Sequence, residues 1–194
     1  MRWNKKFEYP KSIRSTENGI RRYLIGEKKL PSVTSILDAT KSEEDKAALA
    51  NWRERTGQKE SEAIVKAASS RGSKMHAYLE SYLLGQQNMS FFDDDEQYKK
   101  MAKQIIEKGL INRFEEIWGV ECTLFKPDAY SGTCDAVGIY DGKETIIDFK
   151  QSNKPKKIEY IDTWLLQTAA YSLAHNTVYK SNITSCVILV CTVD

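Results

Sequence analysis

An acid and a lysine interrupt what is otherwise the pattern of a buried strand in KETIIDFKQSN, residues 143–153. Side chains alternate across a strand, so Ile147 and Phe149 point to one face while Asp148 and Lys150 share the other. Opposite charges two residues apart are not expected in the core of a sheet. This segment is therefore the first candidate for a functional site.

The sequence before this segment predicts where a second acid lies. The Asp-Gly pair at 141–142 stands between two alternating segments, which is the signal of a hairpin with a two-residue turn. Such a turn pairs Tyr140 with Lys143, and counting back along both strands places Asp135 opposite Asp148. Two aspartates are therefore expected to face each other across neighbouring strands.

A divalent cation would resolve the conflict between these two acids. Directly opposed residues have Cβ atoms about 4.5–5.5 Å apart, and like charges at that separation destabilise a sheet. A hard cation such as Mg²⁺ prefers oxygen ligands and keeps several of its waters. The pattern thus predicts a metal site with Lys150 beside it. The alternative is that Lys150 or Lys143 only pairs with the acids at an exposed sheet edge.

The surrounding sequence predicts a mixed α/β chain whose sheet is assembled late. An Asn-Gly pair at 18–19 indicates an N-terminal hairpin, and Pro31 with Ser32 suits the start of a helix in LPSVTSIL. After these, the strand patterns and the helix between them occupy residues 119–126, 130–140, 143–150, 159–175 (the helix) and 183–191.

Several helices are expected before the sheet. Two highly charged helices, 43–55 and 58–69, are separated by Gly57, and the apolar stripe of RGSKMHAYLESYLLG predicts a core-facing helix that Gly85 ends. A further helical pattern runs from Tyr98 to Trp118. The acidic cluster 93–96 before it is interpreted as complementing the helix macrodipole rather than as a metal site.

Composition excludes several classes of protein. A chain of 194 residues is expected to form one domain with its own core, divided here into a hairpin (1–30), a helical region (31–118) and a sheet core (119–194).

No secretory signal and no membrane span is indicated, so the cytosol of a bacterial or phage-infected cell is the expected location. The cysteines form no CxxC and predict reduced, buried thiols rather than a zinc site or an iron–sulfur cluster; they are Cys122, Cys134, Cys186 and Cys191.

Basic residues are concentrated in parts of the chain, although the net charge is only +2. Residues 1–30 hold nine Lys or Arg and three Glu, and residues 150–157 form a second basic run. Such runs are usually solvated faces and otherwise face phosphates. Residues 41–74 have too few apolar residues for a fully buried helix pair, so part of this region is expected to arch over the active site and guide a strand by its phosphates.

The ordered motifs resemble those of the PD-(D/E)xK nucleases. Asp135 followed by IIDFK is similar to the acid and acid-x-lysine core of that superfamily. RGSKMH with His76, the strand VECTLF, and QTAAY are similar to its RecB-like branch. LPSVTSIL and the charged helices after it resemble the group of the mitochondrial genome maintenance exonuclease and its phage relatives. Together these motifs cover residues 30–190.

This resemblance implies a fold and a set of roles. The fold is α/β, with a mixed central β-sheet flanked by helices, an N-terminal hairpin and a helical arch. Asp135, Asp148 and His76 would bind Mg²⁺ or Mn²⁺, with the carbonyl of Phe149 as a fourth protein ligand. Lys150 would orient the attacking water or stabilise charge on the phosphate. The alternative for His76 is an ordinary residue at the border of an apolar stripe.

Five further residues have supporting roles in this interpretation. Gln167 and Tyr171 share one helical face and either steady Lys150, contact the substrate or are ordinary packing residues. Glu121 either helps to hold the metal or faces outward from its strand. Arg71 and Ser152 are candidates for supporting or substrate contacts.

The sequence departs from the pattern in two places. Gln151 follows the lysine where many relatives have threonine, and such proteins often continue beyond the last strand, whereas this chain ends at Asp194. The expected function is a metal-dependent DNA exonuclease, monomeric and acting on single-stranded ends in replication, repair or recombination. The alternatives are a structure-specific endonuclease and a non-catalytic nucleic-acid-binding module, and the intact set of acids, lysine and histidine argues against the latter.

Overall fold

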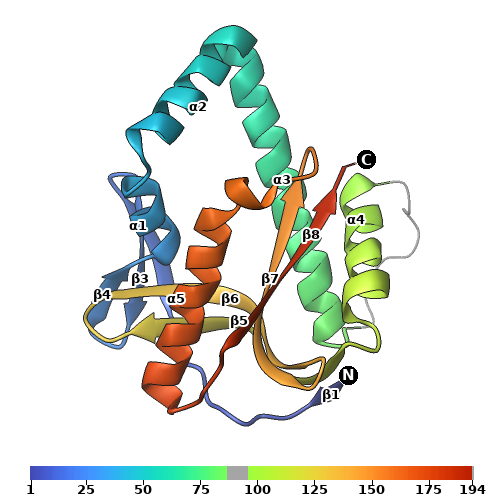
Figure 1. The fold of residues 1–194 in the computed structure, drawn as a ribbon. Coiled ribbons are helices and arrows are strands. Elements are labelled where there is room, and N and C mark those ends of the chain that lie inside the picture. Colours follow the sequence, from blue (N-terminus) through green and yellow to red (C-terminus); the bar gives the residue numbers. More distant parts are fainter. Residues whose placement is uncertain (87–95, 194) are drawn as a thin grey trace.

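A five-stranded mixed sheet lies at the centre of the computed structural model, which describes residues 1–86 and 96–193 (Figure 1). Its order is β1-β5-β6-β7-β8, with β5, β6 and β7 antiparallel and with parallel pairing at both edges. The mixed central sheet expected from the sequence is therefore confirmed. The strands are β1 Arg2–Trp3, β5 Phe114–Lys126, β6 Tyr130–Tyr140, β7 Lys143–Ser152 and β8 Ser185–Thr192.

The hairpin between β6 and β7 has the predicted turn and register. Asp141 and Gly142 both have positive φ, 47° and 74°, as a type I′ turn requires. Five consecutive pairs follow, beginning with Tyr140–Lys143 and ending with Ala136–Ile147. The paired residues thus end one position before Asp135 and Asp148. The prediction that these two aspartates are directly paired across the strands is therefore wrong.

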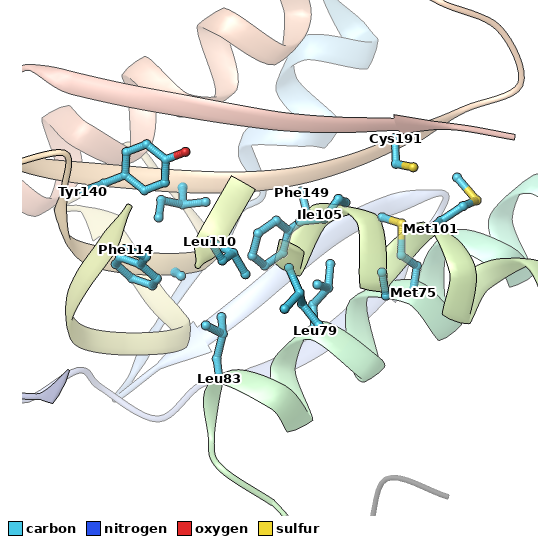
Figure 2. Packing of buried hydrophobic residues seen from close by; sticks show 14 of the residues in the cluster. Met75, Leu79, Leu83, Met101, Ile105, Leu110, Phe114, Tyr140, Phe149 and Cys191 are labelled. Carbon is cyan, nitrogen blue, oxygen red and sulfur yellow. The ribbon is translucent and has the colours of Figure 1, made fainter. Parts of the chain in front are cut away.

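Helices cover both faces of this sheet. In Figure 1, α5 (Asp162–Tyr179) lies over one face, and α3 (Gln58–Leu83) with α4 (Gln97–Ile105) lies over the other. The alternation predicted for β7 is confirmed, because Ile147 and Phe149 pack in the α3–α4 core while Ile146 packs in the α5 core. Figure 2 shows Phe149 among the side chains of the α3–α4 core.

A second, three-stranded antiparallel sheet forms near the N-terminus. Its strands are β2 (Ile13–Glu17), β3 (Ile20–Ile25) and β4 (Lys28–Pro31). Asn18 and Gly19 form the predicted turn, with φ of 51° and 78°. The short strands β1 and β4 were not predicted. Ser32 caps α1 (Val33–Ala39) by accepting a hydrogen bond from the Ser35 N–H, which confirms the predicted helix start.

The helix predicted from Tyr98 to Trp118 is wrong in its second half. α4 passes into a π-helical turn, Ile106–Leu110, and the chain then enters β5 at Phe114. β-Bulges follow Phe114 and Ile117, and they shift the alternation so that both side chains reach the α3–α4 core. Apolar residues three apart therefore imitated a helical stripe. The acidic residues 93–95 lie outside the described residues.

The core-facing helix predicted for RGSKMHAYLESYLLG is confirmed, with Met75, Leu79 and Leu83 buried, but its predicted start is wrong, because α3 is continuous from Gln58 to Leu83. Gly72 lies in the interior of this helix, where a Cβ atom would meet the side chain of Gln151 at 3.4 Å. This is an ordinary contact distance, so α3 packs against the end of β7 at Gly72 without a steric need for glycine. Gly57, with φ of 84°, does separate the helices as expected.

α2 (Glu43–Thr56) and the first half of α3 project away from both sheets and meet at Gly57, as Figure 1 shows. We call α2 and residues 58–70 the helical arch. α2 has no buried residue, and a cavity of about 890 Å³ lies between the two helices, where Arg53, Val65 and Lys66 line it. The arrangement agrees with the expectation that these charged helices are not a buried pair.

Two composition-based expectations can be compared with the structure. No helix in the described ranges is long and apolar enough to cross a membrane. The four cysteines are free thiols, of which Cys122, Cys134 and Cys191 are buried as expected, while Cys186 is exposed.

Candidate active site

The candidate site begins where β6 and β7 separate. Beyond the pair Ala136–Ile147, the N–H of Phe149 donates to Oδ2 of Asp135 at 2.5 Å instead of to a backbone carbonyl. Asp135 is only 8% exposed, so its carboxylate is held in the opening between the strands. Where the β6–β7 pairing ends, a backbone N–H that is not used by the sheet therefore holds the carboxylate of Asp135 in position.

His76 of α3 reaches the same carboxylate. Its Nδ1 lies 3.1 Å from Oδ1 of Asp135, and its ring makes an edge contact with Phe149. Burial by itself would lower the pKa of His76, but the hydrogen bond and charge of Asp135 outweigh it, so the pKa is raised. The structure thus brings together the predicted histidine and the first predicted aspartate.

Glu121 lies in the middle of β5 with an unusual backbone. Its φ of 49° is in the left-handed region, which costs a non-glycine residue about 1–2 kcal/mol. Val120 packs against the α3–α4 core and Cys122 lies in the α5 core, so the normal alternation reverses at Glu121. Strained residues of this kind cluster at functional sites, and this one directs a carboxylate toward Asp135.

Three side chains converge closely enough to share one ion. Within the described ranges, atoms of His76, Glu121 and Asp135 lie within 4.8 Å of one another. Glu121 is exposed at the mouth of its pocket, yet desolvation by the surrounding atoms, followed by the charges of Asp135 and Glu80, raises its pKa to about 7. An acid held against like charges is the ligand that a cation would stabilise most.

The buried Asp148 and the partly exposed Lys150 form an ion pair beside this cluster. Nζ of Lys150 lies 2.5 Å from Oδ2 of Asp148, and Nε2 of Gln167 donates to Oδ1 of the same acid at 3.3 Å. Asp148 is 2% exposed and lies on an inner strand of the sheet, so the alternative of an exposed edge pair is wrong. Burial raises the pKa of Asp148, Lys150 opposes this effect, and the charge of Asp135 adds to it.

The donor set fits a divalent cation. Among the described residues, Oδ2 of Asp148 is a buried oxygen without a well-formed hydrogen bond, despite its ion pair with Lys150. Carboxylate oxygens suit Mg²⁺ and Mn²⁺, and an imidazole nitrogen suits Mn²⁺ better than Mg²⁺. Asp148 lies outside the group of three described above. Binding by Asp148 and by the carbonyl of Phe149 stays a prediction.

Gln167 and Tyr171 support the site from α5. Nε2 of Gln167 also donates to the hydroxyl of Tyr171 at 3.1 Å, and both side chains are buried. A Cβ atom at Gly132 would lie 2.6 Å from the ring of Tyr171, so glycine is required there. Tyr171 thus contacts Gln167, Gln167 contacts Asp148, and Asp148 pairs with Lys150. Any support that the two residues give to the lysine is therefore indirect.

Arg71, Gln151 and Ser152 are bound to other parts of the chain. Nε and Nη2 of Arg71 donate to Oε1 of Gln151 at 3.0 and 2.7 Å, and Gln151 in turn donates to the carbonyl of Ala68 at 3.1 Å. Gln151 therefore ties α3 to the end of β7, a role specific to glutamine at this position. Ser152 donates to the carbonyl of Lys154 and closes the turn after β7.

Sequence reasoning missed several residues around the acids. A pocket of about 350 Å³ contains His76, Glu121, Asp135, Gln167 and Tyr171, and it is also lined by residues of the N-terminal sheet and α1, among them Arg14, Arg21, Ser32 and Thr34. The register of the N-terminal hairpin could have indicated that Arg14 and Arg21 lie on the same face of that hairpin. Nothing in the sequence indicated which face meets the acids.

A mixed sheet that brings Asp135 and the Asp148-x-Lys150 strand together with a helical histidine has the arrangement expected of PD-(D/E)xK nucleases. No family model matches the sequence. Mitochondrial genome maintenance exonuclease 1 of Mus musculus is 31% identical over 139 residues, 66% of this chain, and the protein of that name from Homo sapiens is 28% identical over 166 residues, 78% of this chain.

The chain is therefore distantly homologous to mitochondrial genome maintenance exonuclease 1, and that exonuclease is itself a member of the PD-(D/E)xK nuclease family. This finding confirms the resemblance to the exonuclease that was stated from the motifs. The matched segments make up 39% and 46% of the two relatives, so this chain spans less than half of their length.

Replacing Asp148 with Asn should leave the metal-free protein at least as stable as the wild type. The raised pKa of Asp148 means that its ionised form destabilises the folded state above that pKa, and an uncharged amide removes this penalty. Most substitutions instead destabilise by about 0.5–3 kcal/mol. Thermal melts in EDTA and in millimolar Mn²⁺ measure the effect, and the Mn²⁺-induced rise in melting temperature should be largely lost.

The matched control is Asp141→Asn, an exposed acid paired with Arg113 at the hairpin turn. It should keep the full Mn²⁺ shift. If Asp148→Asn melts well below the wild type in EDTA and still gains the full shift, Asp148 is not part of a metal site.

Mn²⁺ affinity should rise with pH through the pKa of Glu121, about 7, because only the ionised carboxylate binds a metal. Between about pH 6 and about pH 8, the ionised fraction of such a group rises about tenfold. Glu121→Gln should lose this part of the pH dependence in calorimetric titrations. In the metal-free protein, the raised pKa of Glu121 destabilises the fold fully above about pH 7, and this penalty decreases as the pH falls and is absent only below the ordinary pKa of 4.5. An unchanged pH profile in the variant excludes Glu121 as a ligand.

Proposed function

We propose that this chain is a Mg²⁺- or Mn²⁺-dependent deoxyribonuclease that hydrolyses phosphodiester bonds. The observation that carries the proposal is the meeting of His76, Glu121 and Asp135 beside the Asp148–Lys150 ion pair. Distant homology to an exonuclease supports it. An acid-rich site with one directed ammonium group is suited to an anionic phosphate only when a cation is also present.

The cation would be held by Asp135, Asp148 and His76, with Glu121 or the carbonyl of Phe149 as a further ligand, and it would supply a water of lowered pKa and neutralise charge on the phosphate. His76 faces Asp135 through Nδ1, so a proton on Nδ1 would leave the lone pair of Nε2 available. Asp135 would thereby both bind the cation and orient the ring of His76.

Lys150 is the catalytic cation of the chain itself. Asp148 holds its ammonium group at the site, and Gln167 fixes Asp148 from the other side. From that position Lys150 orients the attacking water or stabilises the charge that builds on the scissile phosphate. The water attacks phosphorus directly, the leaving oxygen departs with the cleaved strand, and no covalent intermediate is required.

The proposed substrate is single-stranded DNA with a free end, processed by a monomer during replication, repair or recombination. The helical arch supports this proposal, because its cavity is lined by Arg53 and Lys66 and α2 is not needed by the core. Glu54 and Glu62 line the same cavity, so its charge is mixed, and the support comes from Arg53 and Lys66, whose side chains suit the phosphates of a single strand.

Lys150→Ala should reduce DNA cleavage in Mg²⁺ by at least about 100-fold, the loss expected when a group that stabilises transition-state charge is removed. The fold and Mn²⁺ binding should remain, since Lys150 is not a ligand and lies outside the core formed by Ile147 and Phe149. The measurement is the rate of nucleotide release from labelled single-stranded DNA.

Lys143→Ala is the matched control, because this lysine lies at the exposed start of the same strand. Its activity should equal that of the wild type. Full activity of Lys150→Ala, in protein shown to be free of other nucleases, would falsify the assignment.

A free end should be required if the strand passes through the helical arch. A circular single strand is then expected to be cut at least about tenfold more slowly than a linear strand of the same sequence, because only the linear one can be threaded. Linearising the same circle should restore the rate. Equal rates on both forms would favour the structure-specific endonuclease over the exonuclease.

A further inference from the structure

The basic N-terminal run contributes two arginines to the pocket of the acids. Arg14 of β2 and Arg21 of β3 line this pocket together with Glu121 and Asp135. Part of this run therefore lies at the active site, although charged runs usually cover solvated surfaces.

Strand register explains why these two arginines, and not their neighbour, face the pocket. Arg14 pairs with Tyr23 and Thr16 pairs with Arg21, so all four side chains lie on one face of the hairpin. Arg22 pairs with Ser15 and lies on the opposite face. The hairpin thus presents two of its three arginines to the acids and one away from them.

Contacts with β5 and β6 hold the hairpin in this orientation. Ser12 is hydrogen-bonded to Thr123 at 2.7 Å, and the hydroxyl of Thr133 donates to that of the buried Tyr23 at 3.4 Å. Thr123 and Thr133 each lie two residues from an acid of the site, Glu121 or Asp135. β5 and β6, which contain the acids, therefore also hold the N-terminal hairpin in place.

The backbone of Arg21 is fixed as well. Its N–H donates to the hydroxyl of Ser35 at 2.9 Å, and its carbonyl accepts from the N–H of Ser32 at 2.9 Å. Both guanidinium groups, in contrast, are exposed and form no ion pair with any described residue. Two unpaired guanidinium groups thus extend from a hairpin backbone that is held beside the cluster of His76, Glu121 and Asp135, an arrangement suited to bidentate binding of phosphate oxygens.

We infer that the N-terminal hairpin is a phosphate-binding element: Arg14 and Arg21 hold a non-scissile phosphate of the substrate strand and so position the scissile phosphate at the acids. This inference rests on the proposed nuclease function. A strand carries phosphates at regular intervals, so a strand bound at the acids has a neighbouring phosphate further along the same pocket. The group held is either a terminal phosphate monoester or an internal phosphodiester, which present the same oxygens to an arginine.

A structural role is the competing explanation. Arg14 lies close enough to Glu121 to lower its pKa in part, so the arginines could merely offset the negative charge of the site. In that case their removal would change the stability of the metal-free protein and leave DNA binding unaltered. The two roles therefore differ in a measurable way.

The test measures binding of labelled single-stranded DNA in EDTA, where no cleavage occurs, by fluorescence anisotropy. Arg14→Gln with Arg21→Gln should raise the Kd about tenfold at physiological salt and reduce the slope of log Kd against log salt by about 0.7, because each phosphate of a single strand that a protein neutralises contributes about 0.7 and the two arginines hold one phosphate. Arg22→Gln, with the same charge change on the opposite face, should change the Kd less than about twofold.

Oligonucleotides with a 5′-phosphate, a 3′-phosphate, hydroxyl ends only, or a closed circle distinguish the two phosphate sources. A loss of affinity confined to one phosphorylated end assigns the arginines to a terminal monoester, and an equal loss on all four assigns them to an internal diester. Affinity within twofold of the wild type on every oligonucleotide, or an equal loss for Arg22→Gln, overturns the inference. Binding in EDTA is independent of cleavage, so this failure is distinct from full activity of Lys150→Ala, which would overturn the nuclease itself.

Discussion

The structure is organised around the burial of like charges. Asp135 and Asp148 are both almost inaccessible to solvent, and Glu121 lies within reach of Asp135. Each of the two buried carboxylates is balanced by specific partners: His76 and a backbone N–H for Asp135, and Lys150 with Gln167 for Asp148. These partners come from two helices on opposite faces and from the strands between them. Because no single element supplies the partners of both acids, the site requires the whole layered fold.

The sheet departs from regular geometry where these acids meet. The β6–β7 ladder ends at Ala136–Ile147, and the backbone of Glu121 adopts a left-handed conformation that reverses the alternation of β5. Such strain persists only when the surrounding structure over-determines it. Here the α3–α4 core holds Phe149 on one side and the α5 core holds Tyr171 on the other. The two cores therefore stabilise an opening in the sheet that a flat ladder would close.

Local chemistry made much of this arrangement predictable. An Asp-Gly turn and strict alternation are sufficient to establish the β6–β7 register, and the opposing faces of β7 follow from the same period of two. The misassigned segments depend on tertiary contacts: bulges in β5 let Phe114 and Ile117 imitate a helix, and α3 continues through Gly72, where it packs against Gln151. The position of Glu121 and the choice of which hairpin face meets the acids depend on long-range docking, for which sequence periodicity carries no signal.

The end of β7 connects the chemistry of one face with the helix on the other. Alternation directs Lys150 toward Asp148 and the next residue, Gln151, toward α3, where it receives the guanidinium of Arg71 and donates to Ala68. α3 also carries His76, little more than one helical turn beyond Arg71. Consecutive residues of one strand thus hold both the lysine and the helix that supplies the histidine. Since the same α3 continues into the helical arch, the helix and its contacts with Gln151 join the arch to the site.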